Sequence, residues 1–89
     1  MKIVKSQVKG KKYTAIFEDG TKTSFGAEGM SDYTIHKDKK RRDNYRARHK
    51  KDLDTNDPKR AGYLSYYLLW GDSTDLQTNI KNYISKFKV

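Results

Sequence analysis

The chain has 89 residues, of which 20 are Lys or Arg and 11 are Asp or Glu, so its net charge is +9. This length allows one domain, residues 1–89, and no second core. The absence of cysteine excludes disulfides and thiolate metal sites, and the charge favours polyanions or acidic surfaces as partners. No stretch is apolar for long enough to predict a membrane span or a signal peptide, so we expect an intracellular, non-secreted protein.

Residues 2–25 predict a small three-stranded antiparallel β-meander. The middle strand, Tyr13 to Phe17, combines aromatic with β-branched residues, and its alternation places three apolar side chains on one face. Asp19-Gly20 predicts a two-residue type I′ turn after this strand, because Gly accepts a positive φ freely. Helices that follow in the chain are expected to cover the apolar face.

Residues 26–35 predict a connector between the sheet and the helices. Gly26 and Gly29 have the spacing of neither a dinucleotide fingerprint nor a phosphate-binding P-loop. Tyr33 and Ile35 are expected to point inward from an extended backbone and to anchor the helix that follows.

The next segment, His36 to Lys51, carries nine Lys or Arg residues against two Asp residues, a net charge of +7, and is called the basic segment below. Within it, residues 38–51 predict a helix that Asp38 caps. Tyr45 and His49 lie four residues apart, so they share a face that would seat the helix on the sheet. Most of the cations then face outward.

Like charges four residues apart in the basic segment destabilise a helix unless a partner neutralises them. The segment is therefore predicted to bind an anionic partner, either a polyanion or an acidic protein surface. It contains neither a recognition-helix pair nor an aromatic platform for bases, so no base readout is expected. The candidate binding residues are Lys37, Lys39, Lys40, Arg41, Arg42, Arg46, Arg48, Lys50 and Lys51.

Two further helices are predicted at residues 59–70 and 74–87. The first is apolar almost all round, so it is predicted to be a core element between the sheet and the last helix. The last has apolar residues at helical spacing and a capping box that starts at Thr74. Core packing accounts for most aromatic residues of the first helix, and those that the small sheet cannot cover are predicted to contact a partner protein. These aromatic residues are Tyr63, Tyr66, Tyr67 and Trp70.

The fold class predicted from these elements is α+β: a three-stranded antiparallel meander over about residues 2–25, followed by helices at about 38–51, 59–70 and 74–87. No catalytic or metal site is predicted. His36 and His49 would lie roughly 20 Å apart along a helix, and their cationic neighbours would repel a metal ion. The carboxylates are scattered and no serine is paired with a base, so we expect a non-enzymatic protein without a cofactor.

A resemblance to a known family rests on three groups of residues. They are Ser31-Asp32-Tyr33-Thr34-Ile35-His36-Lys37-Asp38; Arg42, Tyr45 and Arg48-His49-Lys50-Lys51; and Ala61-Gly62, Ser65 and Leu69-Trp70. Over about residues 25–85 the chain resembles a family of small uncharacterised basic proteins of large double-stranded DNA viruses that infect algae and amoebae. Relatives are expected to carry a Trp near Asp54 and an Arg-Trp pair in place of Tyr66-Tyr67. The resemblance implies a setting, the viral particle or its factory in the host cell, and no reaction.

Two functions fit this setting. The first is a virion structural protein, a minor capsid or inner-shell component, whose partners are other virion proteins. The alternative is a sequence-independent protein that binds double-stranded DNA and organises or condenses the viral genome. The absence of a disordered basic tail favours the first function, whereas the concentration of positive charge in the basic segment favours the second. A small nuclease ranks third.

Overall fold

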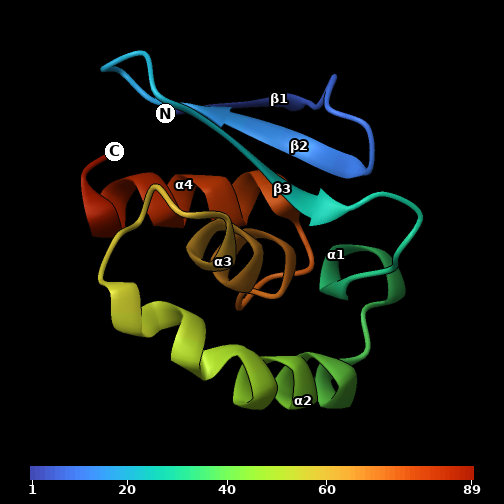
Figure 1. The fold of residues 1–89 in the computed structure, drawn as a ribbon. Helices are drawn as coiled ribbons and strands as arrows, with labels where there is room; N and C mark the ends of the chain where they lie inside the picture. The colour runs from blue at the N-terminus through green and yellow to red at the C-terminus, as the bar shows by residue number, and fades with distance from the viewer.

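The computed structural model describes residues 1–89 and contains a three-stranded sheet followed by helices (Figure 1). The strands β1 (Lys2–Lys5), β2 (Lys11–Ile16) and β3 (Lys22–Ala27) are antiparallel and follow the order β1-β2-β3. Aromatic Tyr13 of β2 pairs with Phe25 of β3. The predicted α+β fold with an antiparallel meander is confirmed.

The connection between β2 and β3 differs from the predicted type I′ turn. A type I′ turn needs two residues with positive φ, but Gly20 (φ 89°) is the only residue of this loop in that region. The Phe17 carbonyl accepts a hydrogen bond from the Gly20 N–H, and the Phe17 N–H donates to the Thr21 carbonyl. The loop therefore has three residues and closes with a left-handed glycine.

The helical part consists of four α-helices, a 3₁₀ helix and a π-helix. In chain order they are α1 (Tyr33–His36), α2 (Lys39–His49), the 3₁₀ helix η1 (Lys50–Thr55), α3 (Ala61–Leu64), the π-helix η2 (Ser65–Leu69) and α4 (Leu76–Phe87). The three predicted helices are present with different bounds: the first continues as η1, the second starts at Ala61 and becomes a π-helix, and the third starts at Leu76. The Asp57 side chain and carbonyl accept the N–H groups of Lys59 and Arg60, and this turn delays the start of α3.

Helix α1 corrects the extended backbone predicted before the basic segment. The Asp32 carboxylate accepts the N–H of Thr34 at 2.9 Å and also its hydroxyl group, so Asp32 is the N-cap of a short helix. Tyr33 is buried, as predicted, but the helical backbone turns Ile35 outward, where it is 61% exposed.

The N-cap of α4 is also displaced from its predicted position. Asp75, and not Thr74, is the capping residue, and its carboxylate accepts the hydroxyl hydrogen of Thr78 at 2.7 Å. This hydrogen bond lowers the pKa of Asp75. The cap therefore lies one residue later than predicted, and the helix starts two residues later than predicted.

The core lies between the sheet and the α3–η2 pair. Ala15, Phe17 and Phe25 of the sheet region are buried together with Leu64 and Leu68 of the helices. The predicted core role of the second helix agrees with this, because α3 and η2 contact both β3 and α4. Figure 1 shows α3 between the sheet and α2. The sequence predicted that helix α2 packs on the sheet, and this prediction is wrong. Helix α2 packs instead on the α3–η2 pair, which lies against the sheet.

Candidate anion-binding surface

The start of the basic helix α2 is fixed by two successive caps. The Asp38 carboxylate accepts the N–H groups of Lys40 and Arg41 at 3.0 and 3.3 Å, which confirms the predicted cap. The Nδ1 atom of His36 accepts the N–H of Asp38 at 2.9 Å. Lys37, between them, has a left-handed backbone with φ of 58°. The cations of α2 therefore project from a helix with a defined origin.

The inward face of α2 consists of Arg42, Tyr45, Arg46 and His49. The Tyr45 ring stacks on His49, as the sequence predicted, with ring centroids 4.1 Å apart. On its other side it stacks on Trp70 at 4.2 Å, with an interplanar angle of 7°. Burial raises the pKa of the Tyr45 phenol. This three-ring stack attaches α2 to the end of η2.

Two of the predicted anion-binding arginines are occupied within the chain. The Arg42 guanidinium lies 5.0 Å from the Tyr33 ring centroid, pairs with Asp43 at 2.9 Å, and its side chain is 12% exposed. Arg46 lies 5.1 Å from the Tyr66 ring centroid and pairs with Asp72 at 3.1 Å. Both guanidinium groups therefore attach α2 to the remainder of the fold and offer little charge to a partner.

The lysines of the basic segment behave differently from these arginines. All five are exposed and none forms an ion pair within the chain. They are called the outward lysines below: Lys37, Lys39, Lys40, Lys50 and Lys51. Their uncompensated charge makes this face of α2 the strongest candidate for contact with an anionic surface.

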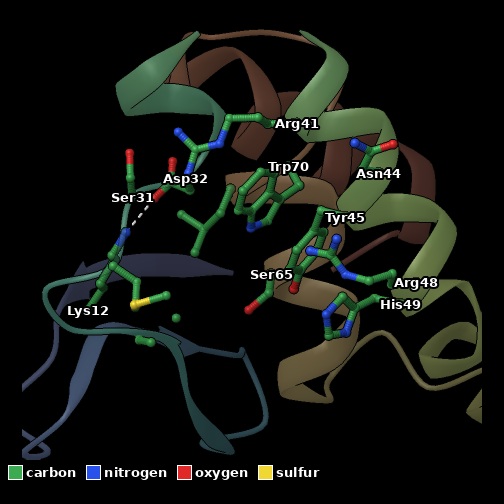
Figure 2. Close-up of a pocket in the computed structure, with 14 residues that line it drawn as sticks. Lys12, Ser31, Asp32, Arg41, Asn44, Tyr45, Arg48, His49, Ser65 and Trp70 are labelled. Atoms are coloured by element: carbon green, nitrogen blue, oxygen red, sulfur yellow. Dashed lines mark hydrogen bonds and ion pairs between the residues drawn. The ribbon is translucent and has the colours of Figure 1, made fainter. Parts of the chain in front are cut away.

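Arg41 and Arg48 line a cleft of about 410 Å³ beside α2 (Figure 2). Together with Asn44 they form one stripe of the helix, at positions i, i+3 and i+7, called the cleft stripe below. The opposite wall includes Lys12 and Ser31, and Ser65 and Leu69 of η2 also line the cleft. The sequence pointed to the two arginines but not to the residues that face them.

The predicted hydrophobic contact residues lie largely inside the protein. Tyr63 and Tyr66 are 6% and 8% exposed, while Tyr67 and Trp70 are partly buried. The Tyr63 hydroxyl donates to the Leu53 carbonyl at 2.8 Å, and the Tyr67 ring packs against Tyr83 and Phe87. Core packing, which the sequence favoured for this cluster, accounts for these rings. Only the outer edges of Tyr67 and Trp70 are accessible to a partner.

The other ion pairs of the chain are separate and join two side chains each. Lys59 bonds to Asp19, which lowers the pKa of that carboxyl, and His49 bonds to Asp52 at 3.1 Å. No group of three or more His, Asp, Glu or Cys side chains is placed to hold a metal ion. No helix has the length and apolar character needed to cross a membrane.

Comparison with known proteins gives one match. The family of unknown function DUF5754 matches residues 1–49, which include the sheet, α1 and α2. No curated protein and no solved structure matches the chain. The matched part holds the outward lysines up to Lys40, the cleft stripe and the inward face, and it spans more than half of the sequence. The chain therefore belongs to the family of unknown function DUF5754.

Proposed function

We propose that this protein is a non-enzymatic structural component of a large DNA virus particle, a minor capsid or inner-shell protein, that binds an acidic protein surface through α2. The observation that carries the proposal is the set of outward lysines, which have no counter-ion in the chain. The positive charges of these lysines repel one another, and this repulsion opposes helix formation. Because an anionic partner neutralises the charges, its binding is electrostatically favourable. The resemblance of about residues 25–85 to small proteins of large DNA viruses supports the setting.

Two exposed apolar side chains favour a protein as the anionic partner. Ile35 in α1 is 61% exposed and Met30, in the loop before α1, is 64% exposed. Both precede the outward lysines closely in the chain, and Met30 also lines the cleft. Apolar side chains gain free energy against a protein surface, whereas a phosphate backbone offers them nothing to contact.

The second candidate is a sequence-independent protein that organises the viral genome, and the density of charge favours it. Helix α2 is about 16 Å long, and unpaired lysines lie at or beyond both of its ends. If five lysines contact phosphates, the logarithm of the DNA-binding constant should fall with the logarithm of salt concentration with a slope of about −4.5.

The virion proposal is tested by locating the protein in purified particles of the virus that encodes it. Quantitative mass spectrometry of washed particles should find it in a fixed ratio to the capsid proteins. Its absence from particles, in cells where the protein is made, would end the virion proposal.

The DNA alternative is tested by a salt titration of duplex binding with the full chain. The test variant replaces the five outward lysines by Gln, and a matched control replaces exposed Lys2, Lys5, Lys9, Lys22 and Lys81 by Gln, with the same loss of charge. If the protein binds DNA through the outward lysines, the dependence of the binding constant on salt concentration should become much weaker in the test variant and change little in the control. Equal slopes for both variants would contradict binding through α2.

A further inference from the structure

The cleft beside α2 holds two positive charges that nothing in the chain neutralises. Arg41 and Arg48 form no ion pair, and both are exposed at the cleft. They lie seven residues apart, about 10.5 Å along the helix axis, with the Asn44 amide between them. Both guanidinium groups can therefore contact one ligand in the cleft.

The only carboxylate in the cleft lining is already fully bonded. One oxygen of Asp32 accepts the N–H and hydroxyl of Thr34, and the other pairs with Lys12 at 2.6 Å. This ion pair is nearly enclosed, because the two side chains are 14% and 3% exposed. The cleft thus offers hydrogen-bond donors on both walls and no free anion, an arrangement that suits an oxyanion.

The cleft also has an apolar part with an unusual backbone beneath it. Leu69 and Ser65 belong to the π-helix η2, in which the Trp70 N–H donates to the Ser65 carbonyl five residues earlier. Such π-turns are rare and are found frequently at functional sites. Gly26 lets β3 approach this turn, since a Cβ there would lie 2.9 Å from a methyl group of Leu69.

We propose that this cleft binds an organic phosphate of nucleotide size, with the phosphate held by Arg41 and Arg48 and the organic part against Leu69 and Met30. A volume of about 410 Å³ suits such a ligand, whereas a DNA duplex is too wide to enter it. Planar guanidinium groups bind phosphate oxygens in pairs, which favours arginine over the lysines that serve the outward face. This site goes beyond the proposed surface binding and uses different residues of α2.

The experiment is an NMR titration of the ¹⁵N-labelled full chain at constant ionic strength. Four probes are compared: AMP, glucose 6-phosphate, inorganic phosphate and adenosine. The single Trp70 gives one indole N–H resonance that reports directly on the cleft. At least one of the two phosphate esters should bind about 10-fold or more tightly than inorganic phosphate and shift this resonance. Preference for AMP identifies a nucleotide, and equal binding of both esters identifies a phosphate-directed site.

A pair of charge-matched variants separates the cleft from the general field of the protein. R41Q/R48Q and K39Q/K50Q both lower the net charge from +9 to +7, but only the first changes the cleft. R41Q/R48Q should weaken binding of the ester about 10-fold, and K39Q/K50Q less than about twofold. Equal losses in both variants, or esters that bind no more tightly than inorganic phosphate or adenosine, would overturn the proposal. Failure here leaves the proposed particle function intact, because the outward lysines are unchanged in R41Q/R48Q.

Discussion

On its inward face, helix α2 contacts the rest of the chain through Arg42, Tyr45, Arg46 and His49, whereas the outward lysines, in α2 and next to its ends, are exposed and form no ion pair in the chain. Both faces are basic in the sequence, but the cations of the inward face are arginines and those of the outward face are lysines. Arginine, with its planar and weakly hydrated guanidinium group, lies over aromatic rings and pairs with carboxylates. The lysines of the basic segment, as strongly hydrated point charges, stay exposed to water. In a basic helix of this kind, net charge alone overstates the charge that a partner can contact.

The two faces also differ in the free energy that they contribute to folding. Each aromatic stack of Tyr45 contributes about 0.5–1.5 kcal/mol beyond the area it buries. Like charges at i and i+4 of a helix cost about 0.2–0.5 kcal/mol per pair. The inward face should therefore determine whether α2 is folded, and the outward face what it binds.

The largest expected effect follows removal of the central ring of the inward face. Tyr45→Ala should lower the free energy of unfolding by about 3 kcal/mol, because it deletes two stacks and opens a cavity beside Trp70. Urea denaturation followed by Trp70 fluorescence measures the change. Lys40→Ala, on the outward face of the same helix, should change it by less than about 0.5 kcal/mol. Similar losses in the two variants would show that the two faces do not differ in this way.

A second comparison uses two arginines of the same helix. Arg42→Ala should cost about 1.5 kcal/mol, because it removes a partly buried cation from the Tyr33 ring and a bond to the Gly71 carbonyl. Arg48→Ala should cost less than about 0.5 kcal/mol, since Arg48 is exposed and unpaired. Arg42→Lys retains the charge without the planar group and should recover less than half of the loss. Full recovery by Lys would contradict a role for guanidinium geometry.

Sequence patterns were sufficient where the signal is local. The Asp38 cap and the i, i+4 pair of Tyr45 and His49 each depend on neighbouring residues, and the structure contains them. Helix α1 was missed because four residues show no period. Its cap residue, Asp32, is moreover held by Lys12, twenty residues earlier.

The parts that sequence could not supply arise from contacts between distant segments. Trp70 determines where α2 packs, yet it lies 25 residues beyond Tyr45, and nothing local indicates that the two rings stack. The cleft joins β2, the loop before α1, α2 and η2, so its composition follows from tertiary packing alone. The change from α3 to a π-helix has no signal in helix propensity, because that scale ranks residues for the ordinary α-helix and does not describe the π form.

A buried tyrosine of α4, Tyr83, predicts a dependence of stability on alkaline pH. Burial raises the pKa of Tyr83 above its usual value, and its hydroxyl donates to the Pro58 carbonyl. The unfolded chain loses this proton near pH 10 while the folded chain keeps it, so stability should fall as pH rises above about 10. Tyr83→Phe should cost about 1 kcal/mol at pH 8 and lessen this fall. Thermal unfolding between pH 8 and 11 tests this, and an unchanged slope in Tyr83→Phe would refute the prediction.

The smallest effect is expected when all five outward lysines are replaced by Gln. Because these side chains make no ion pair in the chain, the free energy of unfolding should stay within about 0.5 kcal/mol of wild type or rise slightly as repulsion is relieved. Any rise should disappear at 1 M salt, where the Debye length is about 3 Å, and that dependence identifies repulsion as its cause. A loss above about 1 kcal/mol would mean that these lysines support the fold. A stable variant instead leaves an intact helix from which only the partner-facing charge has been removed.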